Sequence, residues 1–262
     1  MQLIDIGVNL TNARLYHDRD ALKSDALAVG VIHQIITGTS YEASVKAIEI
    51  CAEDPSYYSA TAGCHPHDAK DLTEEHLNGL KALVQEDTVV AVGECGLDFN
   101  RNFSPPEVQK SVFQKQIVLA LETEKPLFLH QRDAHDEFVA HLAPHQDDLR
   151  GVCHCFTGNK DEMRDYLDMG FYIGITGWLC DERRGADLQN ALKYAPLDRI
   201  MLETDAPYLI PRTIRPRPKS NLNTAANLPY VLQTAAEITG KAPSELAEIT
   251  TENCQRLFNV VR

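Results

Sequence analysis

Four residues that could hold a metal ion stand at the ends of short apolar runs in this sequence. Glu94, His130, His154 and Asp205 each come last, or directly after the last apolar residues, in such a run. If the runs are β-strands, side chains alternate between two faces, so Glu94 shares a face with Val92. Imidazole and carboxylate ligands together are typical of hydrolytic Zn²⁺, Mn²⁺ or Mg²⁺ sites with positions open for water and substrate. The pattern therefore predicts a metal site rather than a structural polar cluster.

The runs that end in these residues belong to a pattern that repeats along the whole chain. Apolar runs alternate with amphipathic segments of helical period; the runs cover residues 3–10, 31–38, 57–64, 89–95, 127–130, 151–156, 171–176 and 200–204. Strand–helix alternation of this kind predicts a (β/α)8 TIM-type barrel, with catalytic residues at the carboxyl ends of its strands. A doubly wound open sheet is the alternative, but no dinucleotide-binding fingerprint follows the first run. Because no linker divides the chain, we expect residues 1–262 to form a single domain.

Two segments between the runs carry signals of their own. Ser104-Pro105-Pro106-Glu107 predicts a capping box that opens a helix reaching Thr123. Residues 207–227 contain no acid and cannot form a regular helix or a central strand, because prolines interrupt them; their prolines and cations are Pro207, Pro211, Pro216, Pro218, Arg212, Arg215, Arg217 and Lys219. This segment follows the eighth run, so we expect it to lie over the mouth of the barrel. A solvated surface is one interpretation, and an anion-binding role is the one that the net charge of −13 favours.

The composition excludes several classes of protein. Hydrophobic residues make up 44% of the chain, which is enough for a full core and argues against disorder. The first residues lack a secretion signal and no apolar run spans a membrane, so we expect a cytoplasmic protein. The seven cysteines predict reduced thiols, and Cys153 and Cys155 lack a second pair that would complete a zinc site. The net charge disfavours a module that neutralises duplex DNA broadly, but it allows an enzyme that grips a few phosphates.

The polar residues lie within short segments that are specific in combination. These segments are Gly63-Cys64-His65-Pro66-His67, Gly93-Glu94-Cys95-Gly96-Leu97-Asp98, Pro126-Leu127-Phe128-Leu129-His130-Gln131-Arg132-Asp133-Ala134, His154-Cys155-Phe156-Thr157-Gly158 and Leu202-Glu203-Thr204-Asp205-Ala206-Pro207. Together they resemble the TatD family of metal-dependent deoxyribonucleases, within the amidohydrolase-like barrels. The resemblance spans the whole chain, and Gly174-Ile175-Thr176-Gly177-Trp178 is similar to the branch named for TatD itself.

The resemblance implies a nuclease that hydrolyses phosphodiester bonds with a divalent metal ion. It implies 3′–5′ exonuclease action on single-stranded DNA, extending to RNA, and a role in DNA repair or degradation. The ligands would be Glu94, His130, His154 and Asp205, with Mg²⁺ as the functional ion and Mn²⁺ or Zn²⁺ as alternatives. A bound metal lowers the pKa of its water, and Asp205 would be the catalytic residue that orients this water and takes its proton.

Further residues are expected to bind the substrate, the 3′ end of single-stranded DNA or RNA. His65 would contact a phosphate or support the metal ligands, and Arg132 would hold a phosphate with its guanidinium group. Trp178 could stack on a base or pack in the core. Glu203 would support the site from the layer below Asp205. We expect the protein to act as a monomer.

One segment departs from the family pattern. Most members begin with D-x-H-x-H, whose histidines bind a metal, but here Gly7 and Asn9 follow Asp5 at those positions. The chain should therefore hold about one tightly bound transition metal rather than two, and Gly7→His with Asn9→His should restore the second unless the new side chains clash. Two rival functions stay open: a metal-dependent amide or ester deacylase, and a non-enzymatic interaction protein.

Overall fold

The strands of the computed structural model, which describes residues 1–261, form one parallel sheet in chain order. They are β1 (Leu3–Val8), β2 (Val31–Ile36), β3 (Tyr58–Ala62), β4 (Val89–Asp98), β5 (Leu127–Arg132), β6 (Gly151–Cys153), β7 (Tyr172–Ile175) and β8 (Ile200–Leu202). β8 returns to β1, where the Asp205 N–H donates to the Gly7 carbonyl at 2.9 Å and the Asn9 N–H to the Ala206 carbonyl at 2.8 Å. The predicted (β/α)8 barrel is confirmed.

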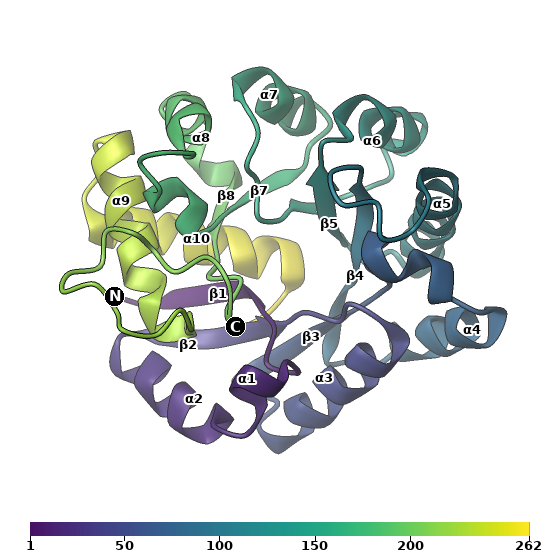
Figure 1. Cartoon of the computed structure of the whole chain (residues 1–262), viewed down its shortest axis with the longest axis horizontal. Helices are drawn as coiled ribbons and strands as arrows, with labels where there is room; N and C mark the ends of the chain where they lie inside the picture. Colours follow the sequence, from purple (N-terminus) through teal and green to yellow (C-terminus); the bar gives the residue numbers. More distant parts are fainter. Residues whose placement is uncertain (262) are drawn as a thin grey trace.

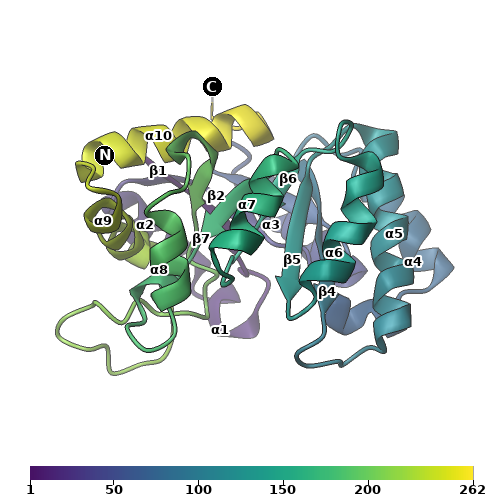
Figure 2. The same ribbon diagram turned by 90° about the horizontal axis from the view of Figure 1, so that it is seen from above.

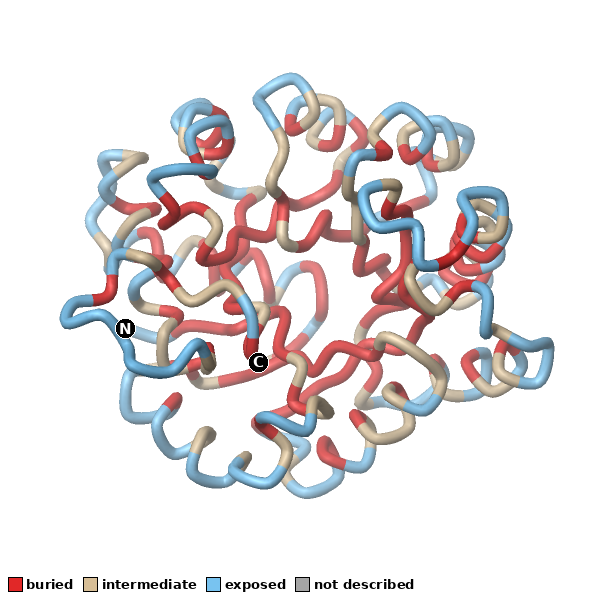
Figure 3. Tube along the Cα trace, in the orientation of Figure 1, coloured by how far each residue is buried: buried red, intermediate tan, exposed pale blue. Residues whose placement is uncertain are grey.

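The helices surround the strands as an outer ring, except that the last helix lies across one end of the barrel (Figure 1 and Figure 2). They are α1 (Ala13–Tyr16), α2 (Arg19–Ala28), α3 (Tyr41–Glu53), α4 (Glu74–Leu83), α5 (Pro106–Thr123), α6 (His135–Leu142), α7 (Lys160–Asp168), α8 (Ala186–Leu192), α9 (Leu228–Thr239) and α10 (Pro243–Phe258). Buried chain lies along the strands and on the inner side of the helices, while the outer helix faces are exposed (Figure 3). None of the helices in the described part of the chain has the length and hydropathy that a membrane crossing needs.

The two ends of the barrel differ. At the amino-terminal end, α10 lies across the strands (Figure 2), and its Leu257 and Phe258 pack with Ile4, Phe128 and Met201 from the barrel interior. At the opposite end the strands run out into loops, among them the proline-rich residues 207–227, as the sequence predicted. One end of the barrel is thus filled by side chains, and the other is left to the polar residues.

The capping box predicted at Ser104 is wrong, although the helix itself is present. α5 runs over Pro106–Thr123 and begins after Pro105, without a side-chain cap. The Ser104 hydroxyl instead donates to the His67 carbonyl at 2.8 Å and accepts from the Lys70 N–H at 3.0 Å. Ser104 therefore joins the loop before α5 to the loop after β3, and the prolines alone start the helix.

Candidate active site

The strands reach the carboxyl-terminal mouth at different heights. β4 continues through Glu94 to Asp98, whereas β6 and β8 stop before His154 and Asp205, so these two residues lie just past their strands. Gly96 lets β4 stay paired with β5 this far, because its φ is +143° and a Cβ there would lie 1.9 Å from the His130 carbonyl oxygen. Glu94 and His130 are thereby held on adjacent paired strands.

The carboxylate of Glu94 is the centre of the polar cluster. Its Oε1 atom accepts from His154 Nε2 at 2.8 Å and from His130 Nδ1 at 3.1 Å, and His65 Nε2 lies 3.3 Å away. Burial alone would raise the pKa of Glu94, but the charges of His154 and His65 and the imidazole hydrogen bonds hold it well below its usual range. Glu94 is therefore an anion enclosed by three imidazoles, and the fold brings His130 and His154 together with it.

His154 is held between two carboxylates. Its Nδ1 atom donates to Glu203 Oε2 at 3.2 Å while Nε2 faces Glu94, and Glu203 also accepts the Cys155 N–H. Burial would lower the pKa of His154, but Glu94 and Glu203 raise it well above the usual value. Glu203 thus fixes the ring and would keep the proton on Nδ1 if a metal replaced the one on Nε2, in the manner of carboxylates that support metal-binding histidines. The supporting role that the sequence predicted for Glu203 fits this geometry.

Asp205 is joined to the residue that replaces a family histidine. The Asn9 side-chain amide donates to Asp205 Oδ1 at 3.0 Å and to the Ala206 carbonyl at 3.2 Å. Burial raises the pKa of Asp205 to about 7, helped by the charges of Glu94 and Glu203 and opposed by His154. Asn9 therefore holds this carboxylate in place, and its amide nitrogen, which cannot bind a metal, points towards Asp205.

Gly7 leaves room for Glu203. A Cβ at Gly7 would lie 2.3 Å from Glu203 Oε2 and 3.3 Å from the Phe128 ring. Any side chain at this position would displace the carboxylate that orients His154. The exchange Gly7→His, which was expected to restore a second metal site if it fitted, is therefore blocked by Glu203.

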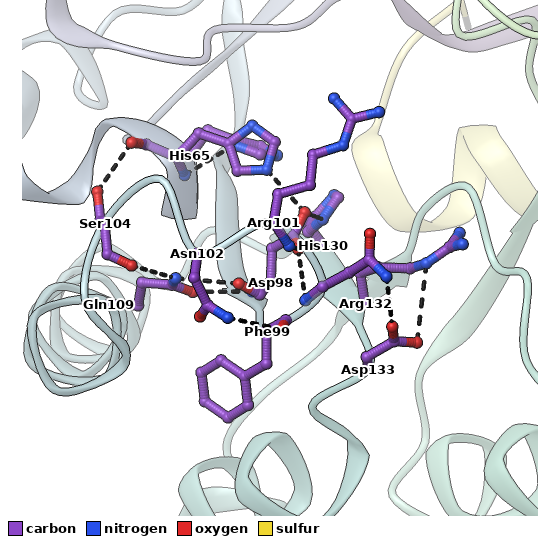
Figure 4. Close-up of polar contacts among 12 residues, drawn as sticks. His65, Asp98, Phe99, Arg101, Asn102, Ser104, Gln109, His130, Arg132 and Asp133 are labelled. Atoms are coloured by element: carbon purple, nitrogen blue, oxygen red, sulfur yellow. Dashed lines mark hydrogen bonds and ion pairs between the residues drawn. The ribbon is translucent and has the colours of Figure 1, made fainter.

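Asp98 is a residue of the site that the sequence reasoning missed. Its Oδ2 atom accepts from His67 Nε2 at 2.7 Å and lies 3.4 Å from His130 Nε2. Figure 4 shows Asp98 beside His130. The pKa of Asp98 lies below its usual range because its contact with His130 and its hydrogen bonds from the Arg101 N–H and from His67 outweigh its burial. The signal was present, since residues four apart on one strand share a face, and Asp98 follows Glu94 at that spacing.

Two buried glutamines of α5 brace the loops of the site. Gln109 accepts the Asp98 N–H at 2.8 Å and donates to the Asp98 and Ser104 carbonyls (Figure 4). Two turns further along the same face of α5, Gln116 accepts the Cys64 N–H at 2.8 Å and donates to the Cys64 carbonyl at 3.0 Å. Each glutamine thus satisfies the N–H and the carbonyl of one residue at a strand end, Asp98 or Cys64. These hydrogen bonds fix the backbone at Asp98 and next to His65.

Arg132 lines a cavity of about 630 Å³ at the mouth, together with Phe99, Thr157 and Trp178. Its guanidinium lies 3.5 Å from Thr157 Oγ1 and 3.8 Å from Asp133 Oδ1, and its side chain is 36% exposed. The guanidinium carbon also lies 5.2 Å from the centre of the Trp178 ring. Arg132 is thus accessible and only weakly paired, as a phosphate-binding residue requires.

The donor atoms fit a divalent metal ion. His65, Glu94 and His130 each place a ligand atom within 4.8 Å of the other two, and His154 contacts the same Glu94 oxygen. His130 Nε2 is one of two buried side-chain nitrogens without a hydrogen-bond partner in residues 1–261. A cation can replace the protons that the histidines now share with Glu94. By contrast, none of the cysteines in the described chain joins such a cluster.

Replacing Glu203 by Ala should weaken metal binding about 10–100-fold, because His154 loses the carboxylate that orients it. Glu203→Gln is the matched variant: it keeps the volume and an acceptor oxygen, so its loss should be smaller. Calorimetric titration with Mn²⁺ measures both dissociation constants, and circular dichroism checks the fold. Unchanged affinity in both variants would show that His154 needs no such support.

Comparison with known proteins agrees with this geometry. The family described as TatD related DNase matches residues 4–259. A protein of Cronobacter sakazakii named 3′-5′ ssDNA/RNA exonuclease TatD is 49% identical, with 98% of this chain and 97% of that protein covered. The protein of the same name from Salmonella typhimurium is 45% identical, with 99% and 100% covered.

Solved structures show the same architecture. A TatD family hydrolase from Entamoeba histolytica has a TM-score of 0.91 at 27% identity, and the alignment covers 98% of each chain. The TatD homolog YJJV from Escherichia coli has a TM-score of 0.90 at 27% identity, with 99% of this chain and 98% of that one covered. The resemblance drawn from the sequence motifs is confirmed, and the chain belongs to the family of TatD-related DNases.

Proposed function

We propose that this protein is a metal-dependent 3′–5′ exonuclease that hydrolyses phosphodiester bonds of single-stranded DNA and RNA. The observation that carries the proposal is the buried Glu94 carboxylate, which three imidazoles surround at the open end of the barrel. The names of the relatives from Cronobacter sakazakii and Salmonella typhimurium supply the substrate class and the polarity. A role in trimming damaged or frayed DNA ends belongs to the same proposal.

Glu94, His130 and His154 would hold the metal, with Asp205 beside them. When bound, the ion would lower the pKa of its water and neutralise charge on the scissile phosphate. We propose Mg²⁺ in function, because it accepts few protein ligands and keeps waters and substrate phosphate in its shell; Mn²⁺ and Zn²⁺ suit the two imidazoles equally well. All these residues come from one chain, so a monomer is sufficient.

His65 is better suited to bind the substrate than the metal. Its Nδ1 atom accepts the His67 N–H at 3.1 Å, and burial lowers the pKa of His65 to about 4, so the neutral ring carries its proton on Nε2. Because the His67 N–H occupies Nδ1, the ring cannot move this proton there to free Nε2 for a metal, although the distance from Nε2 to Glu94 would allow one. The protonated Nε2 can donate a hydrogen bond to a phosphate oxygen, which is one of the two roles expected from the sequence.

Asp205 would act as the general base. Asn9 occupies its Oδ1 atom, and a pKa of about 7 lies near the pH at which proton transfer is most efficient. A cation at Glu94 would stabilise the ionised form, so Asp205 would be ready to orient a water and take its proton. Arg132, two residues after His130, would hold a phosphate next to the scissile bond.

The test is to follow hydrolysis of single-stranded oligonucleotides that carry a label at either end. With Mg²⁺, a 5′-labelled strand should shorten stepwise, whereas a 3′-labelled strand should release a labelled mononucleotide at once. A blocked 3′ end should abolish both reactions. Release of acid or amine from acylated substrates, without any cleavage of DNA or RNA, would instead identify the protein as a deacylase.

A further inference from the structure

A second cavity, of about 400 Å³, lies beside Trp178 between the loop that follows β7 and residues 207–227. We call it the cationic cavity because five cations line it against one carboxylate, Asp181; the cations are Arg183, Arg184, Arg212, Arg217 and Lys219. The whole chain carries a net charge of −13, so this concentration of positive charge runs against its composition. The mechanism proposed above makes no use of it.

Asp181 arranges the arginines without neutralising them. Its buried carboxylate accepts from Arg183 at 3.0 and 3.1 Å and from Arg184 at 2.9 Å, and Arg212 Nε lies 3.6 Å away. These bonds, chiefly those from Arg183, hold the pKa of Asp181 below its usual range. The side chains of Arg183 and Arg184 nevertheless stay 59% and 52% exposed. One buried anion thus holds the guanidinium groups of Arg183 and Arg184 in place at the surface, where they can meet phosphates at little further cost in ordering.

Arg217 and Lys219 complete the wall from the proline-rich segment. Within residues 1–261, neither side chain lies within ion-pair distance of a carboxylate, whereas Arg212 pairs with Glu182 at 3.2 Å. Both residues are exposed. Of the cations in the cavity, these two therefore have no carboxylate partner among residues 1–261 and can pair fully with a bound anion.

Trp178 connects this cavity to the active site. Its ring lines both cavities, with the Arg132 guanidinium carbon 5.2 Å and the Arg184 guanidinium carbon 4.2 Å from its centre. Arg132 in turn lies on the strand that carries His130. Cationic groups therefore follow one another from the polar cluster around Glu94, past Trp178, into the cationic cavity.

We propose that the cationic cavity binds the phosphodiester backbone of the nucleotides that precede the scissile 3′ nucleotide. This inference rests on the proposed nuclease function and adds a second substrate-binding site to it. A duplex is a poor occupant, because a cavity of about 400 Å³ admits one backbone rather than two paired strands. Affinity should therefore depend on the length of the nucleic acid strand. A strand contacts these cations only if it reaches from the polar cluster around Glu94 past Trp178.

The test uses the double variant Arg217→Gln with Lys219→Gln. Fluorescein-labelled oligothymidylates of about three and about twelve nucleotides bracket the length at which a strand would reach the cavity. Binding is followed by fluorescence anisotropy in chelator, where cleavage cannot occur, over a series of salt concentrations. The variant should bind the long strand about 3–10-fold more weakly at low salt, and the slope of log K against log salt should fall by about 1.4 for two lost contacts.

The matched control is Lys81→Gln with Lys193→Gln, which removes the same charge from two exposed lysines of α4 and of the end of α8. It should leave the affinity and the salt slope of the long strand unchanged. Equal weakening by both double variants, or unchanged binding in the cavity variant, would overturn the inference. The nuclease function is tested separately: if the unaltered enzyme with Mg²⁺ cleaves neither oligonucleotide, that function fails whatever the anisotropy shows.

Discussion

Asp205→Asn should lower kcat about 10²–10⁴-fold while the affinity for single-stranded DNA changes little. Asn preserves the size of the side chain and can still meet the Asn9 amide, which now donates to Asp205 Oδ1 at 3.0 Å. It cannot accept a proton from water, because an amide oxygen is not a base at neutral pH. Single-turnover hydrolysis gives the rate, and anisotropy in chelator gives the affinity.

Asp168→Asn serves as the control for this substitution, since Asp168 is an exposed residue at the end of α7. Its kinetics should match those of the unaltered enzyme. If Asp205→Asn lost affinity and rate by the same factor, Asp205 would be a binding residue. If it also lost tight metal binding, Asp205 would be a ligand rather than the base.

Removal of the metal should abolish hydrolysis and leave the barrel folded. The cluster of Glu94 and its histidines lies at the ends of the strands, whereas the interior below it is filled by apolar side chains such as Phe128, Val152 and Met201. The fold therefore does not depend on an ion to fill its core. Dialysis against chelator, followed by Mg²⁺, Mn²⁺ or Zn²⁺, should erase and then restore activity with an unchanged circular dichroism spectrum.

Titration of the metal-free protein with Mn²⁺ or Zn²⁺ counts the tightly bound metal ions. We expect about one tight site per chain, because Gly7 offers no ligand and the Asn9 amide is turned towards Asp205. Two tight sites in the unaltered protein would contradict this expectation and would direct attention to Asp98 and His67 as additional ligands. Activity that survives complete metal removal would contradict the mechanism as a whole.

Much of the fold was predictable because it depends on local patterns. Alternating apolar and amphipathic segments predicted all eight strands, and their ends placed Glu94 and His130 on neighbouring strands. The exact reach of each strand was not predictable. The pairing of β4 with β5 shifts register between Gly93 and Cys95, and such a shift decides which side chains face the mouth. Asp98 was missed because the predicted run ended at residue 95, whereas β4 continues to Asp98.

The supports of the site could not be predicted for a different reason. Gln109 and Gln116 lie on the buried face of α5, where a periodicity argument expects apolar residues. They stabilise the site through hydrogen bonds to the backbone of Asp98 and Cys64, which lie outside α5. Hydrogen bonds between residues distant in sequence leave no mark on local composition, so only the folded structure shows them.

The position of α10 has a consequence for the order of events during synthesis. The barrel is sealed at its amino-terminal end by Leu257 and Phe258, which pack with Ile4 of the first strand, and Thr251 donates to the Gln2 carbonyl at 3.0 Å. Residues of α10 therefore bury residues of β1, which are made long before them. While α10 is still inside the ribosomal exit tunnel, the lower barrel interior has no cover and its apolar side chains meet water. The native core of the barrel can therefore close only once α10 has left the exit tunnel and packed against β1.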